Sequence, residues 1–438
     1  MPKENQATHQ QAQVVKQGTG SNLCESILLA ANFLDQVREG SSLTEALANA
    51  PSENRSAAQS LSFEALRYKP KTTEALKLFL SKAIDPEVED LLLIAISTLF
   101  SDSMNQYPAH TLVNETVKAA QKSIRTRHAK GLINAVLRRI IENPNALLID
   151  VENAQYPSWW VKNLKKSYPQ NFKPILETYL KPAKMFLRVN ARRGTLEGYL
   201  KRLQQDNIEI LEIPLEWQKQ APYAIALKNS TPVNKLPGFM DGDVSIQDLG
   251  AQMAAQLLEP KNSDVILDAC AAPGGKACHL LEAADIQLDV LEISPERMKR
   301  VEENLKRLQL KANLILGDAC NSSTWSQGKK YDAILADVPC SATGIIRRHP
   351  DILYLRRGSD IPELQELQRK MVSELWQLLK PGGKMLYVTC SILPQEGENQ
   401  CVWFLNNLKD VLRLDCAGQL LPNDWHDGFF YGILQKKK

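Results

Sequence analysis

The chain of 438 residues has 44% hydrophobic and 24% charged residues and a formal net charge of +3. Its length predicts about two to four domains, and its near-neutral charge excludes a uniformly basic nucleic-acid binder, so any such surface has to be local. The start of the chain lacks the apolar core of a secretion signal, and the longest apolar run, residues 91–96, is too short to span a membrane. Eight cysteines without a C-x-x-C pair argue against a zinc ribbon and a disulfide framework. We therefore expect a reduced, cytoplasmic monomer with no metal, no membrane contact and no obligate protein partner.

The first 148 residues fall into a polar tail and a helical part. Residues 1–20 are rich in Gln, Thr, Ser and Gly with almost no large apolar side chain, which predicts a disordered tail. From residue 21 to 148 apolar side chains recur at helical spacing, which predicts a compact all-helical domain. The helices are expected to break at Gly40, Pro51, Pro70, Pro86 and Pro108.

A basic stretch runs from Lys118 to Ile140 and contains no Asp or Glu. Such a stretch is typical of a surface that meets phosphates, but it is equally typical of a solvated helical face, and the sequence leaves both interpretations open. Its basic residues are Lys118, Lys122, Arg125, Arg127, Lys130, Arg138 and Arg139.

Residues 149–243 have a mixed pattern that predicts a small α+β linker domain. Trp159 and Trp160, at the start of its first helix, either stack on bases or bury at least one ring in a core. The expected elements are a helix that opens at 157–160, a strand at 186–190, a helix near 198–205 and a strand at 208–213.

An α/β domain is expected over residues 244–438. A short apolar run at 264–267 ends in small residues, Pro273 and two glycines, and helical spacing follows, so a strand leads through a tight turn into a helix. Neither a Walker phosphate loop nor a dinucleotide fingerprint fits the turn, because Cys270 replaces the first glycine and the glycines are adjacent. The turn instead suits close approach to an uncharged or zwitterionic ligand such as S-adenosylmethionine.

Two acidic residues close the next two apolar runs. Glu292 and Asp318 fall at strand ends, where an open α/β sheet places the carboxylate that binds a ribose diol, although each is equally consistent with a helix cap or a solvated turn. Further elements are expected as a helix at 247–258, a strand at 331–336, a helix at 367–379, a turn at 381–383, a strand at 384–388, a helix at 401–405 and a final apolar run at 429–434.

Two cysteines directly follow apolar strands at the edge of the sheet that carries the glycine turn. Cys340 and Cys390 are therefore expected to face the cleft, whereas five others are expected to pack in the core: Cys24, Cys278, Cys320, Cys401 and Cys416. An unmodified pyrimidine carbon is a poor nucleophile, so its alkylation requires addition of a thiolate to the neighbouring ring carbon and later removal of a proton by a second group. Asp337 is placed to hold the amidine edge of the base.

These residues resemble the family of RNA cytosine-5 methyltransferases, and in particular its bacterial small-subunit ribosomal RNA branch of the Fmu or Sun type. The matching blocks are long: residues 268–276, 337–351 and 389–394, and the segment 131–138 resembles a NusB-like RNA-binding domain. The resemblance implies three parts: an all-α NusB-like domain at 21–148, the α+β linker and RNA-contacting domain at 149–243, and a Rossmann-like class I methyltransferase domain at 244–438.

The resemblance also implies roles for single residues. Cys390 attacks carbon 6 of cytosine, Cys340 assists resolution of the adduct, and Asp337 contacts both the target base and the methyl donor. Glu292 stands where the family often has Asp, and Val338 stands where Ala is usual. Contacts to S-adenosylmethionine, which leaves as S-adenosylhomocysteine, are implied for Cys270, Ala271, Ala272, Pro273, Gly274, Gly275, Lys276, Glu292, Asp318 and Asp337.

The implied reaction is methylation of carbon 5 of a cytosine in small-subunit (16S) ribosomal RNA, on an unpaired or extruded nucleotide. The same chemistry on transfer RNA is an alternative, and so is a catalytically silent RNA-binding assembly factor, which would have no chemical reason to keep Cys340, Cys390 and Asp337. Arg347, Arg348 and His349 either anchor flanking phosphates or form a salt-bridged surface loop.

Overall fold

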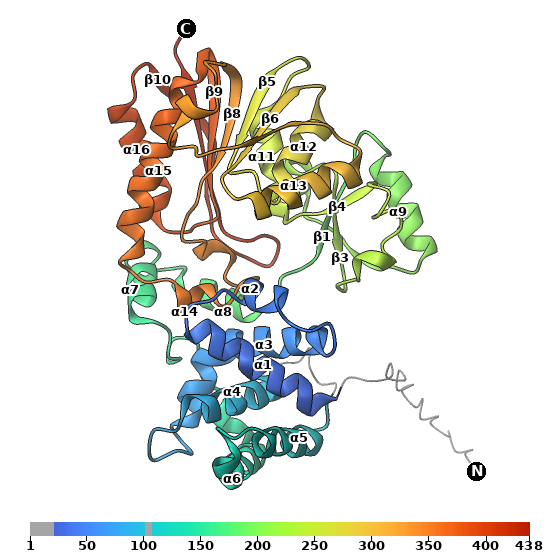
Figure 1. The fold of residues 1–438 in the computed structure, drawn as a ribbon, viewed down its shortest axis with the longest axis vertical. Coiled ribbons are helices and arrows are strands. Elements are labelled where there is room, and N and C mark those ends of the chain that lie inside the picture. The colour runs from blue at the N-terminus through green and yellow to red at the C-terminus, as the bar shows by residue number, and fades with distance from the viewer. Residues whose placement is uncertain (1–21, 101–106) are drawn as a thin grey trace, which may run out of the picture.

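The computed structural model describes residues 22–100 and 107–438, and the predicted disordered tail at 1–20 lies outside them. Figure 1 shows a helical part at one end of the molecule, a large sheet with its helices at the other, and a small α+β part beside the sheet. None of the helices in the described ranges is long and apolar enough to cross a membrane.

The helical part forms because amphipathic segments with good caps bury a shared core. The Asn22 side chain caps the first helix by accepting from the Cys24 amide, and Ser42 and Glu45 form a capping box on the second. Side chains such as Ile27 and Leu92 are fully buried between the helices. The helices are α1 (Leu23–Arg38), α2 (Leu43–Ala48), α3 (Arg55–Leu76), α4 (Pro86–Phe100), α5 (Ala109–Lys122) and α6 (Lys130–Glu142), with 3-10 turns η2 (Arg127–Ala129) and η3 (Pro144–Leu147).

One of the five expected helix breaks is wrong. Pro70 lies inside α3 and is buried, whereas the other four residues lie between helices or at helix starts. A proline inside a helix removes one amide donor and crowds the preceding turn. Here α3 continues because it packs between α1 and α4, and the Pro70 carbonyl accepts a hydrogen bond from the Gln155 amide at 2.9 Å. Tertiary packing has overridden the local signal.

The small α+β part contains an antiparallel sheet in the order β2-β3-β1-β4, against which α9 and α10 pack, whereas α7 and α8 pack with the segments around Ile346 and Ile392. Strand β4 directly follows the predicted border at 243/244 and pairs with β1, so the sheet of this part crosses that border. Trp160 has no exposed surface, which agrees with the expectation that at least one tryptophan is buried. The elements are α7 (Ser158–Ser167), α8 (Phe172–Leu180), β1 (Phe186–Val189), α9 (Leu196–Gln205), β2 (Ile210–Leu211), α10 (Leu215–Gln220), β3 (Ala224–Leu227), η4 (Val233–Lys235) and β4 (Val244–Ile246).

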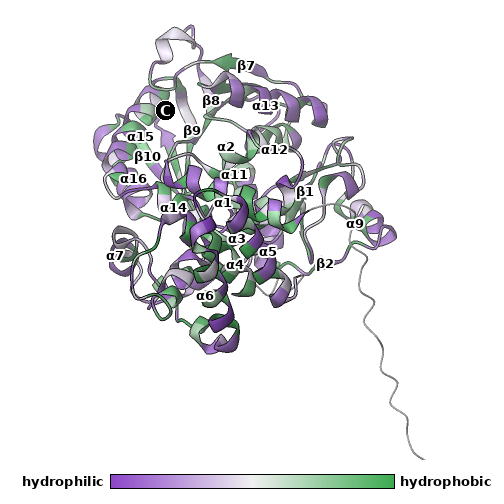
Figure 2. Ribbon diagram, turned by 60° about the horizontal axis from the view of Figure 1, so that its bottom comes forward, coloured by the Kyte–Doolittle hydropathy of each residue, from purple (hydrophilic) through white to green (hydrophobic). Residues whose placement is uncertain are grey.

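The large sheet has seven strands in the order β10-β11-β9-β8-β5-β6-β7. The pairs among β9, β8, β5, β6 and β7 are parallel, and β11 is antiparallel to both β9 and β10. Alternate residues face two helical layers: Ile266 packs with α11, α12 and α13, and Leu267 packs with α15 and α16. The outer surface of α13 is largely hydrophilic (Figure 2). Helices thus cover both faces of the sheet. A ligand can therefore bind at the edge where the carboxyl ends of the parallel strands lie.

Most elements of this part were expected, but two strands differ from the expectations. Strand β10 was not predicted, because its residues are mostly half-buried or exposed and give no apolar run. The expected turn at 381–383 lies within β9, where the pairing with β8 shifts register. The elements are α11 (Leu249–Leu258), β5 (Val265–Ala269), α12 (Gly275–Ala283), β6 (Gln287–Glu292), α13 (Pro295–Leu308), β7 (Asn313–Leu316), η5 (Ser322–Thr324), β8 (Tyr331–Asp337), η6 (Thr343–Ile345), α14 (Ile352–Leu355), α15 (Asp360–Gln377), β9 (Leu379–Thr389), η7 (Pro394–Glu396), α16 (Glu398–Asn407), β10 (Val411–Leu420) and β11 (Phe429–Lys436).

Candidate active site

Two thiols meet at the carboxyl edge of the large sheet. Cys340 lies just beyond β8 and Cys390 directly follows β9, and their sulfur atoms are 3.4 Å apart. Both residues line a cavity of about 880 Å³, in the usual size range of a ligand site. The expectation from the strand ends that both cysteines face one cleft agrees with this placement.

The two thiols have different surroundings. A hydrogen bond with Cys390, followed by burial, raises the pKa of Cys340 well above its ordinary value. Cys340 is therefore a thiol at neutral pH, able to donate to its neighbour. Cys390 is partly exposed and is the member of the pair that interacts electrostatically with the Lys276 ammonium. This division suits Cys390 to attack and Cys340 to handle a proton.

Lys276 and Asp337 form a close ion pair beside the thiols. The Lys276 Nζ lies 2.6 Å from Asp337 Oδ2, and the lysine also lies over the Phe429 ring. Burial opposes the ammonium, but the Asp337 carboxylate and its hydrogen bond, with a smaller contribution from Cys390, raise the pKa of Lys276. The site thus holds a fixed positive charge where a thiolate has to form.

The glycine turn leads from β5 into α12. Its backbone takes left-handed conformations at Cys270 (φ +64°) and Gly274 (φ +94°), and a Cβ on Gly274 would lie 3.2 Å from Val301. Glycine is favoured at that position, because other side chains rarely adopt this φ and a Cβ would also press on α13. The predicted ligand contacts in the turn divide into two groups: Cys270, Ala272, Pro273 and Lys276 line the cavity, but Ala271, Gly274 and Gly275 are not among the described residues that do so.

The two acidic strand ends also reach the cavity. Glu292 and Asp318 both line it, with Glu292 only 1% exposed. Glu292 Oε1 accepts from the amides of Ile293 and Ser294, each at 3.1 Å, and Asp318 Oδ1 accepts from the Cys320 amide at 2.8 Å. Each carboxylate is thus fixed by local backbone while lying at the wall of the pocket.

Asp268 is a functional candidate that sequence reasoning did not include. It is fully buried near the end of β5, and neither of its carboxyl oxygens has a hydrogen-bond partner among the described residues. Burial, then the neighbouring Asp337 charge, raises the pKa of Asp268 well above its ordinary value. In the sequence, Asp268 stands directly before the small residues that lead into the turn, and this position could have indicated it.

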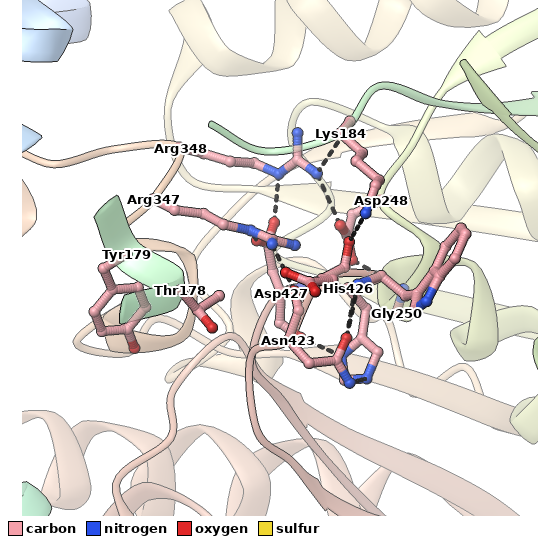
Figure 3. A network of polar contacts seen from close by, with 12 residues as sticks. Thr178, Tyr179, Lys184, Asp248, Gly250, Arg347, Arg348, Asn423, His426 and Asp427 are labelled. Carbon is pink, nitrogen blue, oxygen red and sulfur yellow. Dashed lines mark hydrogen bonds and ion pairs between the residues drawn. The ribbon is translucent and has the colours of Figure 1, made fainter. Parts of the chain in front are cut away.

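Arg347 and Arg348 form a buried ion-pair network, shown in Figure 3. Arg347 is 2% exposed and pairs with Asp427, and Arg348 pairs with Asp427 and with Asp248 at 2.8 Å. The sequence left open whether these arginines anchor phosphates or form salt bridges in a surface loop. In the structure they form salt bridges, but these are buried inside the protein. Burial lowers the pKa of His349, so this side chain adds no charge at neutral pH.

Two other parts of the chain contact the cysteine loops. From the small α+β part, Tyr179 Oη donates to the Thr343 carbonyl and Tyr168 Oη donates to the Ile392 carbonyl, both at 2.6 Å. From the C-terminal hairpin, the Gly428 amide donates to the Gly344 carbonyl at 2.8 Å. The thiol site is therefore assembled from segments far apart in the sequence, and these partners gave no local signal.

A Rossmann-like sheet with a glycine turn, strand-end carboxylates and a cleft-facing thiol pair defines the molecule as a methyltransferase. The family 16S rRNA methyltransferase RsmB/F matches residues 255–434, an RsmF/B-like ferredoxin-like domain matches residues 156–234, and the NusB family matches residues 26–142. The chain is 39% identical to ribosomal RNA small subunit methyltransferase B of Vibrio cholerae, over 93% of this chain and 96% of that protein. The same-named protein of Proteus mirabilis is 37% identical over 93% and 96% of the two chains. The chain belongs to this methyltransferase family.

Solved structures share the fold. The crystal structure of PH0851 matches with a TM-score of 0.76 at 22% identity, over 96% of this chain and all of that chain. NSun6 from Pyrococcus horikoshii with SFG matches with a TM-score of 0.57 at 20% identity, over 64% and 98%. The predicted resemblance and the predicted three-part fold class are confirmed, while the predicted domain borders and the roles of single residues stay predictions.

Proposed function

We propose that this protein transfers the methyl group of S-adenosylmethionine to carbon 5 of a cytosine in small-subunit ribosomal RNA, through a covalent adduct with Cys390. The observation that carries the proposal is the thiol pair, with its sulfur atoms 3.4 Å apart, on the wall of the cavity that also holds Glu292 and the glycine turn. An activated thiol beside a methyl-donor pocket has a chemical use in the alkylation of a pyrimidine carbon.

The residues present fit the methyl donor. Glu292 and Asp318 offer carboxylates at neighbouring strand ends, Ile293 offers an exposed apolar side chain, and the cavity of about 880 Å³ has room for a donor and a base. When bound, S-adenosylmethionine supplies an electrophilic methyl group. We assign the ribose diol to Glu292, because a buried, backbone-fixed carboxylate at the end of the second strand suits that contact.

In this proposal, different residues of the chain attack the base, bind its amidine edge, supply positive charge and transfer a proton. The Cys390 sulfur bonds to carbon 6, which moves electron density to carbon 5, while Asp337 holds the amidine edge and Lys276 supplies positive charge. After methylation, carbon 5 loses its proton and the electron pair of the carbon–sulfur bond returns to Cys390. Cys340 lies in contact with that sulfur, and we assign to it a proton relay: its thiol proton passes to the departing Cys390 sulfur, and the Cys340 sulfur takes up the proton that carbon 5 releases.

The helical part supplies the proposed RNA-docking surface. Within the basic stretch, Lys118 pairs with Glu115, Lys122 with Glu25, and Arg125 with Asp35 and Glu87, so these charges are partly neutralised. Four others are exposed and have no acidic partner within 4 Å among the described residues: Arg127, Lys130, Arg138 and Arg139. We propose that these four meet phosphates of the RNA.

The setting that we propose is the cytoplasm, with the protein acting as a monomer. All eight cysteines are free, and a reducing compartment keeps the Cys340–Cys390 pair as thiols. The test of the function is to map 5-methylcytosine in ribosomal and transfer RNA of cells with and without the protein. Loss of one site in small-subunit ribosomal RNA is expected; loss in transfer RNA alone would reassign the substrate, and no loss in either would refute the enzymatic proposal.

A further inference from the structure

One buried carboxylate joins the two loops that carry the thiols. Glu396 lies in the short turn η7 and has no exposed surface. Its Oε1 accepts from the Ser341 amide at 2.8 Å, and its Oε2 accepts from the Ser391 hydroxyl at 2.7 Å and from the Ser341 hydroxyl. Ser341 directly follows Cys340, and Ser391 directly follows Cys390. The same side chain therefore binds the residue after each thiol.

A second ring of hydrogen bonds fixes this carboxylate. Gln368 Nε2 donates to Glu396 Oε1 at 3.1 Å and to the Pro339 carbonyl at 3.0 Å. The Thr343 hydroxyl lies 3.1 Å from the Ser391 hydroxyl. Four donors thus converge on two oxygens, a pattern that an ionised carboxylate satisfies and that an amide of the same shape does not. Glu396 is fully buried and is not among the described residues that line the cavity.

We infer that Glu396 is a positioning residue, which holds the two thiols in contact by clamping Ser341 and Ser391 to one carboxylate. The catalytic consequence rests on the proposed function, whereas the spacing of the thiols does not. Contact between the sulfurs depends on two separate loops keeping their places to within a fraction of an ångström, and buried hydrogen bonds to a charged group supply that precision. The hydrogen bond with Cys390, burial and the Glu396 charge together raise the pKa of Cys340, so the clamp also keeps this thiol protonated.

Thiol proximity tests the clamp without any catalytic assay. The full chain is treated with diamide, which accepts two electrons and two protons from a thiol pair, and the Cys340–Cys390 disulfide is followed by peptide mapping. Glu396→Gln turns one acceptor into a donor that faces other donors, so disulfide formation should slow by about tenfold. Glu398→Gln is the matched control, because Glu398 lies two residues away, pairs with Arg413 on the surface, and should leave the rate unchanged.

A milder variant, and a comparison of the effects on kcat with those on KM and Kd, complete the test. Ser391→Ala removes one hydrogen bond of the clamp but keeps the carboxylate, and about a threefold slowing is expected. In methylation assays Glu396→Gln should lower kcat by about a hundredfold and leave the KM for RNA and the Kd for S-adenosylmethionine unchanged. Wild-type disulfide rates in both variants would overturn the inference. An absence of methylation by the wild type, with slowed disulfide formation in the variants, would instead overturn only the proposed function.

Discussion

Arg67 Nη2 donates a hydrogen bond to the carbonyl oxygen of Arg347 at 3.0 Å, which joins helix α3 to the loop that follows Cys340. Arg67 is buried and also pairs with Glu64 on its own helix. Two further hydrogen bonds cross the same boundary: the Leu43 amide donates to Asp351 at 3.0 Å, and Tyr354 Oη donates to the Leu66 carbonyl at 3.0 Å. These three hydrogen bonds therefore attach the helical part directly to the segment that follows Cys340.

Substitution of Arg67 should weaken this attachment. Arg67→Ala leaves Glu64 buried without its partner, so we expect the free energy of unfolding to fall by about 3 kcal/mol. Urea denaturation followed by tryptophan fluorescence measures the change. Arg138→Ala, at an exposed arginine that donates a hydrogen bond to the Asn134 side chain, is the control and should change the free energy by less than about 0.5 kcal/mol. An equal effect of the two substitutions would contradict the attachment.

The roles of the two thiols are separable with ordinary and trapping RNA. RNA that carries 5-fluorocytidine should form a covalent complex through Cys390, because fluorine cannot leave as a proton does. Cys390→Ala should abolish this complex, and Cys340→Ala should accumulate adduct with unmodified RNA because release is slowed. Gel mobility and peptide mapping detect both.

Cys416→Ala is the control for the thiol experiment, since Cys416 lies on β10 and its sulfur contacts the Tyr431 carbonyl. This variant should behave as the wild type. An adduct found on Cys340 would reverse the assigned roles, and full turnover by Cys340→Ala would remove that residue from the mechanism.

Glu292 should contribute to affinity for the methyl donor. Glu292→Gln keeps the size of the side chain but removes a charge from the predicted ribose contact, and the Kd for S-adenosylmethionine should rise by about tenfold or more. Isothermal titration calorimetry gives the value. Glu296→Gln, at an exposed residue that accepts a hydrogen bond from the Ser294 hydroxyl, should bind the donor normally; equal affinities in the two variants would argue against the ribose assignment.

The exposed cations of the helical part should set the salt dependence of RNA binding. Replacement of Arg127, Lys130, Arg138 and Arg139 with Gln removes up to four phosphate contacts, so the slope of log K against log salt should fall by up to about 3. Filter binding at several salt concentrations measures it. Replacement of Lys118 and Lys122, whose charges already pair with Glu115 and Glu25, should reduce the slope much less. An unchanged slope in the quadruple variant would refute the docking surface.

Asp90 should make stability depend on pH. Burial, only partly opposed by Arg38, raises the pKa of Asp90 to about 7. Because the folded pKa lies above the unfolded value, the stabilisation by protonated Asp90 is complete below about pH 3.8 and is lost as the pH rises through about 7. Asp90→Asn should therefore gain about 3 kcal/mol relative to the wild type between about pH 4.5 and 8. The exposed Asp85→Asn is the control, and an equal shift in both variants would contradict the assignment.

The sequence pattern located the thiols and the strand-end carboxylates because each follows directly on an apolar strand, and parallel strands bring their carboxyl ends to one edge. It did not reveal Glu396, because its partner Ser341 lies on another loop, 55 residues away, although Ser391 is near in sequence and the repeated Cys-Ser dipeptide was visible. Nor did it decide the state of Arg347, since its partner Asp427 is supplied by the C-terminal hairpin. Contacts across long sequence separations were the common reason for what local patterns missed.

Strand β11, the last of the chain, lies in the sheet between β9 and β10, and the residues before it bring Asp427 and Gly428 against the cysteine loops. A ribosome translating this protein must therefore have synthesised β11 before the reactive pocket can be completed. A chain that stops just upstream of this strand would carry both thiols, but it would lack Asp427 and Gly428 and would leave the edge of β9 unpaired.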